Sequence, residues 1–161
     1  MLRWILIGVA AVLVLIQLVP VDRSNPPATE KLVMPDNVQQ IMQRSCFDCH
    51  SNETVWPWYS YVAPVSWLVK HDVEEGREHL NFSEWDKLNQ KRKMKRLEEI
   101  VEEVEEGKMP MPIYLIMHGD AEVSAAELAV LREWTQQELG NLGGADMGSS
   151  NDNDEAHEEE H

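Results

Sequence analysis

Five consecutive residues, Cys46-Phe47-Asp48-Cys49-His50, carry the clearest chemistry in this sequence. Two thiols separated by two residues lie along one side of a helical turn, and an imidazole follows at once. This order fits covalent attachment of a haem, in which the two sulfurs add across the vinyl groups at one porphyrin edge and the imidazole binds the iron. The spacing therefore predicts one haem c per chain, held by Cys46 and Cys49, with His50 as the proximal iron ligand.

Other uses of two neighbouring cysteines remain as alternatives. A thioredoxin-like redox pair belongs to a strand–helix–strand setting, and almost no stretch here shows the alternation of a strand. A structural zinc site needs two further ligands at regular spacing, whereas the histidines are scattered. A disulfide between the two would close a very small loop and stabilise the fold little.

A methionine–proline segment, Gly107–Pro112, offers a second axial ligand. A methionine thioether is soft and neutral, so it favours reduced iron, and the prolines stiffen the segment that presents it. We expect Met109 to be the distal ligand. The alternatives are Met111, a vacant or water-bound iron that would open the site to catalysis, or one of the histidines, His71, His79 and His118.

Four helices are predicted around these residues, because apolar side chains recur at helical spacing. The first starts at Pro35 and Asp36, carries Val38, Ile41 and Met42 on one face and leads straight into the cysteine motif. The other three cover about 64–76, 84–106 and 125–139.

Local signals mark the ends of these three helices. Pro64 suits the first turn of the helix over 64–76, Trp67, Leu68 and His71 are expected to point inward from it, and Gly76 weakens or ends it. The other two helices open with residue pairs that resemble capping boxes and stop at glycines. The pairs are Ser83 with Asp86 and Ser124 with Glu127, and the glycines are Gly107 and Gly140.

The N-terminal segment is apolar from Trp4 to Val19 apart from Gln17, with Arg3 before it and Pro20 after it. Its length just suffices for a bilayer crossing, and no small-x-small cleavage site follows. Residues 1–20 are therefore predicted to be an uncleaved signal anchor, with a cleaved signal peptide as the alternative. Because Arg3 favours a cytoplasmic N-terminus, we expect a single-pass inner-membrane protein with its haem domain on the periplasmic side.

Composition divides the rest of the chain. Residues 21–34 are rich in proline and indicate a tether, 35–140 form the haem-binding domain, and 141–161 are Gly-, Ser- and acid-rich and predicted to be disordered. The expected fold is all-α: a small cytochrome c-like helical domain around one haem, preceded by a transmembrane helix. The net charge of −15 argues against a nucleic-acid partner, because phosphate binding needs clustered Lys and Arg.

Several segments together resemble the bacterial haem-binding domain family of short, membrane-anchored cytochrome c-like proteins. They are Val19–Pro27, Ser45–Asn52, Pro57–Tyr59, Ala63–Trp67, Glu75–Ser83 and Met109–Pro110. The resemblance covers about residues 15–138. It implies a haem c domain behind an N-terminal membrane segment, with Cys46 and Cys49 on the haem, His50 proximal and Met109 where a distal methionine is expected.

Two classes of function follow. Iron held by His50 and Met109 is closed to substrates, so the chain is expected to be a one-electron carrier for redox partner proteins, not an enzyme. The alternative is a haem-dependent enzyme such as a small peroxidase, or a haem-based sensor, with an open distal site. The family resemblance does not name the electron donor or acceptor.

Overall fold

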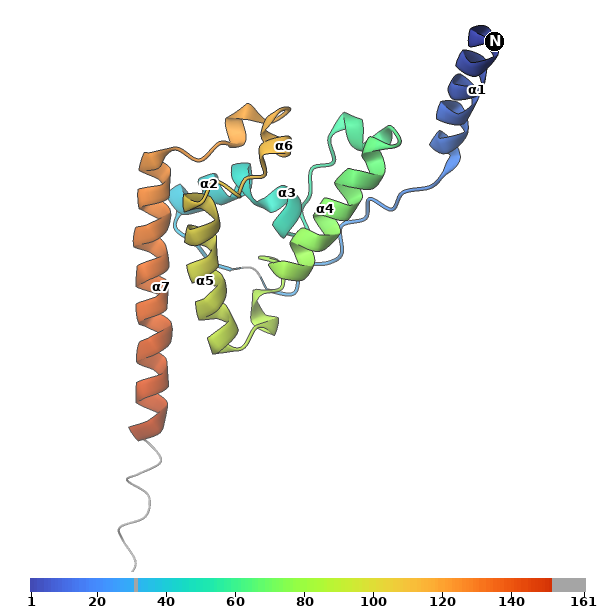
Figure 1. Ribbon diagram of the computed structural model, residues 1–161. Helices are drawn as coiled ribbons and strands as arrows, with labels where there is room; N and C mark the ends of the chain where they lie inside the picture. Colours follow the sequence, from blue (N-terminus) through green and yellow to red (C-terminus); the bar gives the residue numbers. More distant parts are fainter. Residues whose placement is uncertain (31, 152–161) are drawn as a thin grey trace, which may run out of the picture. The chain divides into compact units, whose positions relative to one another are not determined.

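The computed structural model describes residues 1–30 and 32–151, and Figure 1 shows the course of the chain. Helices and short 3₁₀ turns make up its regular structure. Within the described ranges there is no strand, only an isolated parallel bridge between Glu30 and Glu84. The prediction of an all-α fold is confirmed.

The helices fall into two compact units, and each unit is built from two separate stretches of chain. The first unit combines Met1–Leu32 with Cys46–Glu84, and the second combines Val33–Ser45 with Trp85–His161. The cysteine motif lies in the first unit, and the methionine–proline segment lies in the second.

The N-terminal helix is shorter than predicted. α1 covers Leu2–Leu15, which is 14 residues, and the 3₁₀ turn η1, Ile16–Leu18, follows it. At a rise of about 1.5 Å per residue, α1 is about 21 Å long, against about 30 Å for the hydrocarbon core of a bilayer. Among the residues described, no helix combines the length and the apolar character that a membrane crossing requires. The transmembrane helix predicted over residues 1–20, and with it the single-pass inner-membrane location, is therefore wrong.

Gln17 shows why the regular helix stops early. Its side-chain amide donates to the carbonyl of Ala63 (3.0 Å) and accepts from the Ala63 amide (2.9 Å), while also donating to the carbonyl of Leu13 (2.9 Å). The one strongly polar residue of the segment thus pairs with backbone in the first unit, and Pro20 follows three residues later.

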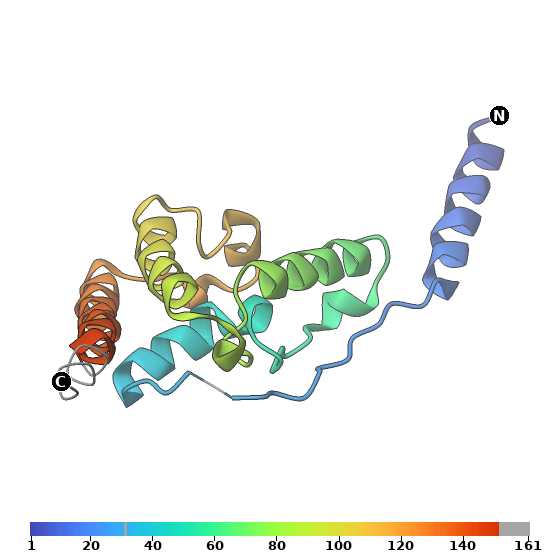
Figure 2. The same cartoon turned by 90° about the horizontal axis from the view of Figure 1, so that it is seen from below.

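The core of the first unit forms where α3, Phe47–His50, packs against α4, Val65–His79 (Figures 1 and 2). A 3₁₀ turn, η2, Trp58–Tyr61, also contacts α4. The buried side of α4 consists of small residues, and these let neighbouring backbone approach closely. They are Ser66, Val73 and Gly76.

α4 differs from its prediction in two ways. It continues past Gly76 to His79, because Gly76 is a buried interior position and does not cap the helix. The side chains predicted to point inward are exposed instead: Trp67 by 39% and Leu68 by 44%, with His71 also exposed. The inward face is set by close contact with α3, which favours small residues over large apolar ones.

Residues 22–30, here called the strap, run extended along the first unit. Arg23 Nε donates to Ser60 O (2.8 Å), Asn25 Nδ2 donates to Thr54 O (3.0 Å), and Thr29 N donates to Ser83 O (3.0 Å). The segment predicted as a tether is therefore hydrogen-bonded to the unit that holds the cysteine motif.

The second unit is a helical cluster around one apolar core. Its elements are α2 (Asp36–Ser45), η3 (Trp85–Lys87), α5 (Gln90–Glu105), α6 (Pro112–Leu115), η4 (Gly119–Ala121) and α7 (Ala125–Asn151). α5 and α7 lie side by side in both views (Figures 1 and 2). The core side chains come from five of these elements and are Val38, Ile41, Met42, Trp85, Leu97, Ile100, Ala121, Leu131 and Trp134. The first predicted helix, with its apolar face, is confirmed as α2.

α5 starts six residues later than predicted. Its N-cap is Asn89, whose Oδ1 accepts the Arg92 amide at 2.9 Å. Ser83 has a different role, because its Oγ accepts the buried amide of Asn52 at 3.0 Å. The predicted end is correct: Gly107 takes a φ of +67°, a left-handed conformation that glycine adopts without a steric cost.

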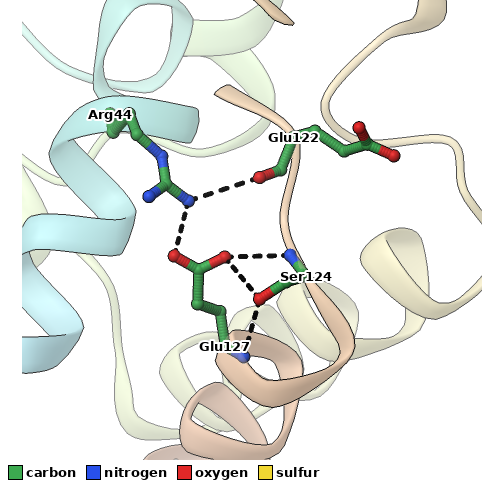
Figure 3. A network of polar contacts seen from close by, with 4 residues as sticks. All are labelled: Arg44, Glu122, Ser124 and Glu127. Carbon is green, nitrogen blue, oxygen red and sulfur yellow. Dashed lines mark hydrogen bonds and ion pairs between the residues drawn. The ribbon is translucent and has the colours of Figure 1, made fainter. Parts of the chain in front are cut away.

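The start of α7 is a capping box, as predicted. Ser124 N and Oγ donate to Glu127 Oε2 at 2.9 and 2.8 Å, and the Glu127 amide donates to Ser124 Oγ at 3.3 Å. Arg44 of α2 joins this network, because its guanidinium lies 2.8 Å from Glu127 Oε1 and 3.3 Å from the carbonyl of Glu122 (Figure 3). The box therefore also ties α7 to α2.

The end of α7 differs from its prediction. The helix continues past Gly140 to Asn151, since Gly140 does not adopt a positive φ and so does not break the helical path. Of the tail predicted to be disordered, residues 152–161 lie outside the described part of the chain.

Candidate functional site

The single turn of α3 brings the three motif residues together. The His50 amide donates to Cys46 O at 2.9 Å, and the Cys49 amide donates to the same carbonyl at 3.2 Å. Both cysteines are half-buried, and neither forms a disulfide. The structure therefore places two thiols and the imidazole within one turn, as the sequence predicted.

Two backbone carbonyls hold the imidazole of His50, one in α4 and one just after its end. Nδ1 lies 2.8 Å from Gly76 O and 3.1 Å from Leu80 O. A carbonyl only accepts, so Nδ1 carries the proton and Nε2 keeps its lone pair. Burial lowers the pKa of His50, which favours the neutral ring. The chain thus presents an oriented, neutral Nε2, the form in which histidine binds a metal.

Gly76 allows this contact because α4 approaches α3 very closely. A Cβ at this position would lie 2.7 Å from Cys49 O and 3.1 Å from Cys49 Cβ. These are atoms of the cysteine turn, which cannot rotate away as the end of a long side chain can. Only glycine fits between α4 and the motif, so the role predicted for Gly76, a weak point or end of the helix, is wrong.

The thiol of Cys49 is poorly suited to redox exchange. Burial, followed by the nearby charges of Asp48 and Asp72, raises its pKa to about 11. A thioredoxin-like nucleophile needs the opposite shift, because the thiolate is the reactive form. The environment of Cys49 therefore argues against a catalytic dithiol.

The residues predicted as distal ligands are spread over the fold. Met109 and Met111 belong to the second unit, after the turn at Gly107, and both are half-buried. The amides of Lys108 and Met109 each donate to Glu103 O at 3.0 Å, which fastens this segment to the end of α5.

The three histidines proposed as alternatives have other surroundings. His71 is exposed and its Nε2 lies 3.6 Å from Glu75 Oε1, and His79 is exposed at the end of α4. His118 stacks on Tyr114, with ring centroids 4.2 Å apart. Across residues 1–30 and 32–151, no three His, Cys, Asp or Glu side chains gather as a metal site.

The first unit fits a covalently held haem. Its donor set is two thiols and one neutral imidazole, and these are the groups that such attachment uses. In this unit the Trp56 indole N–H is buried and has no hydrogen-bond partner among the described residues; in the second unit the same is true of Trp134 Nε1 and Ser45 Oγ. A buried donor left unpaired costs about 1–3 kcal/mol, so it marks a place where a bound acceptor would add stability. Nothing in the sequence distinguishes Trp56 in this respect from the other tryptophans.

Comparison with known proteins gives one match. No curated protein and no solved structure matches the chain. A family model described as a haem-binding domain matches residues 11–137, which is well over half of the chain and includes the cysteine motif, α4 and the methionine–proline segment. The chain therefore belongs to the haem-binding domain family, as the resemblance in its sequence had indicated.

Proposed function

We propose that this haem-binding protein is a c-type cytochrome that transfers single electrons. Cys46 and Cys49 would hold the haem by thioether bonds, and His50 would bind the iron through Nε2. The observation that carries the proposal is the position of His50, which lies on the same turn as both thiols. Its Nδ1 is hydrogen-bonded to Gly76 O and Leu80 O, 2.8 and 3.1 Å away. When bound, haem iron supplies a one-electron Fe(III)/Fe(II) couple.

Residues of the first unit would prepare this site before the cofactor arrives. The carbonyls of Gly76 and Leu80 would fix the tautomer and direction of His50, and hydrogen bonding of this kind makes a ligating imidazole more basic. Phe82 closes one side of the ring, edge-on at 6.4 Å between centroids, and it stacks on Phe47 at 5.4 Å. An apolar, pre-formed surround of this type keeps water from the ligand and limits rearrangement on electron transfer.

We further propose Met109 as the distal ligand, with Met111 as the alternative. A second, neutral ligand would leave no open position for substrate, which favours an electron carrier over an enzyme. The fastening of the Met109 amide to Glu103 supports this choice, because it limits the freedom of the segment just before the thioether.

The central test is the mass of the intact protein. The chain is produced together with a cytochrome c maturation machinery, and we expect it to gain the mass of one haem. The double variant Cys46→Ala, Cys49→Ala should lose this gain, whereas Met109→Ala, the matched control that keeps both thiols, should retain it. Colourless wild-type protein whose two thiols react with an alkylating reagent would contradict the proposal.

A further inference from the structure

We infer that Arg77 is a positioning residue for His50, acting through the loop that follows the cysteine motif. This inference rests on the haem attachment proposed above and assigns to the same site a residue outside the ligand set. Arg77 is next to Gly76 on α4, so its backbone belongs to the segment that lies against Cys49, and the Gly76 carbonyl in this segment accepts the hydrogen bond from His50 Nδ1.

The guanidinium of Arg77 binds the loop after His50 on one side. Its Nε donates to Ser51 O at 2.8 Å, and one terminal nitrogen donates to Thr54 Oγ1 at 2.9 Å. Ser51 directly follows His50 and is fully buried, and Thr54 Oγ1 donates in turn to the carbonyl of Asp48, between the two cysteines, at 2.7 Å. Arg77 therefore binds the backbone directly after His50. Through Thr54 it is also linked to the Asp48 carbonyl in the middle of the motif.

The same guanidinium also binds the strap. The terminal nitrogen that contacts Thr54 donates to Asn25 Oδ1 at 2.7 Å, and the other donates to Ser24 O at 3.4 Å. Asn25 completes the link, because its Nδ2 donates to Thr54 O at 3.0 Å. Arg77 thus joins α4, the loop after His50 and the strap.

This arrangement constrains His50 from both ends of the residue. Its ring is fixed by carbonyls of Gly76 and Leu80, and its own carbonyl accepts the Phe82 amide at 2.8 Å. The next peptide carbonyl, that of Ser51, is fixed by Arg77. Without Arg77 the Ser51 carbonyl would lose its side-chain donor, although Ser83 Oγ would still hold the Asn52 amide. The backbone next to His50 would then be held less firmly, and the imidazole plane would be less closely fixed.

This role requires an arginine because four acceptors surround the planar guanidinium. They are Ser51 O, Thr54 Oγ1, Asn25 Oδ1 and Ser24 O. Guanidinium offers five N–H donors in fixed directions, whereas a lysine ammonium is a point charge on a flexible stem. Burial lowers the pKa of Arg77, because the guanidinium is partly removed from water and relies on these protein acceptors in its place. A lysine here would preserve the charge and lose most of the geometry.

The experiment compares the holoprotein with Arg77→Lys and Arg77→Gln, and uses Arg23→Gln as the matched control. Arg23 also fixes the strap, through Ser60 O at 2.8 Å and the face of Tyr61 at 4.3 Å, and these contacts lie outside the motif loop. Two readouts are used: the electron paramagnetic resonance g-values of the ferric protein, which report the axial imidazole orientation, and amide exchange in the loop 51–55 and at Phe82.

We expect both Arg77 variants to keep the covalent haem, to change the g-values, and to exchange the loop amides on the order of tenfold faster, as expected for losing one or two hydrogen bonds to a charged donor. Arg23→Gln should leave both readouts as in the wild type. Arg77→Lys carries the test if Arg77→Gln does not fold.

Wild-type g-values and exchange rates in Arg77→Lys would overturn the inference, because a positive charge without the guanidinium geometry would then be enough to position His50. The same holds if Arg23→Gln produces the same changes as the Arg77 variants. Wild-type protein that gains no haem would instead refute the proposed function, so the two failures are distinguishable.

Discussion

At the residue scale, Gly76 lies where α4 leaves no room for a side chain beside Cys49. Gly76→Ala should raise the helix propensity of α4 by about 1 kcal/mol, yet the new Cβ would meet Cys49 O at 2.7 Å. Overpacking against backbone costs about 1–3 kcal/mol, so we expect a net loss of stability and a slower covalent attachment of haem. Chemical denaturation of the apoprotein measures the first effect, and absorbance during maturation measures the second.

Gly140→Ala is the control for this substitution. Gly140 is also helical, but a Cβ added to it would meet nothing within 4 Å, so alanine should stabilise α7 by about 0.5–1 kcal/mol. We therefore expect alanine to lower the stability of the protein at Gly76 and to raise it at Gly140. A stabilised Gly76→Ala protein would show that α4 can move away from the motif at little cost.

The three motif residues were recognisable from the sequence, and the groups that hold His50 in place were not. Cys46, Cys49 and His50 lie within five residues of the sequence, so a local pattern reveals them. The hydrogen bonds from His50 Nδ1 are accepted by backbone carbonyls 26 and 30 residues further along the chain, and every residue has a carbonyl. No residue type identifies such partners, so only the packing of α4 on α3 could reveal them.

At the element scale, the capping box of α7 should make stability depend on pH. Hydrogen bonds from Ser124, then the nearby Arg44, lower the pKa of Glu127 below its ordinary value of 4.5. The unfolded chain therefore binds this proton more readily, so the contribution is fully present above about pH 4.5 and is lost as the pH falls through the lower, folded value. Glu127→Gln should cost about 1 kcal/mol at neutral pH, and the gap to the wild type should close below about pH 4.5.

Denaturation at a series of pH values tests this, with Glu133→Gln, an exposed position later in the same helix, as the control. If the difference in unfolding free energy between the wild type and Glu127→Gln stays constant with pH, the charge of Glu127 does not contribute to stability.

The N-cap of α5 gives a second prediction for an element. Asn89→Ala removes the acceptor for the Arg92 amide and should destabilise the protein by about 1 kcal/mol. Asn89→Asp keeps an acceptor and should retain most of the stability. Thermal unfolding of the three proteins provides the measurement, and equal midpoints for Asn89→Ala and the wild type would mean that the helix starts elsewhere.

Helix starts were predictable only where nothing competed for the capping residue. Ser124 and Glu127 face each other and form the expected box. Ser83 has the same local sequence signal, but its hydroxyl is used by the buried amide of Asn52, 31 residues away. A long-range hydrogen bond thus overrode a local preference, and the helix began at the next good cap, Asn89.

At the scale of the whole molecule, the distal ligand proposed above, Met109, belongs to the second unit. Met109→Ala should lower the reduction potential by about a tenth of a volt or more and let the ferrous protein bind carbon monoxide. Met111→Ala should change neither. Redox titration and carbon monoxide difference spectra measure the two effects, and an unchanged Met109→Ala protein would move the ligand to another residue.

The order of the chain through its two units has a kinetic consequence. α2 precedes the cysteine motif in sequence but packs in the second unit, whose α5 and α7 come after α4. A chain emerging from its N-terminus therefore exposes Cys46, Cys49 and His50 before either unit has all of its parts. During this time the three motif residues are accessible to solvent, and the imidazole of His50 is not yet hydrogen-bonded to Leu80 O. A catalyst that attached the proposed haem during synthesis would meet an unfinished protein, whereas one that acted after folding would meet an imidazole already held by Gly76 O and Leu80 O.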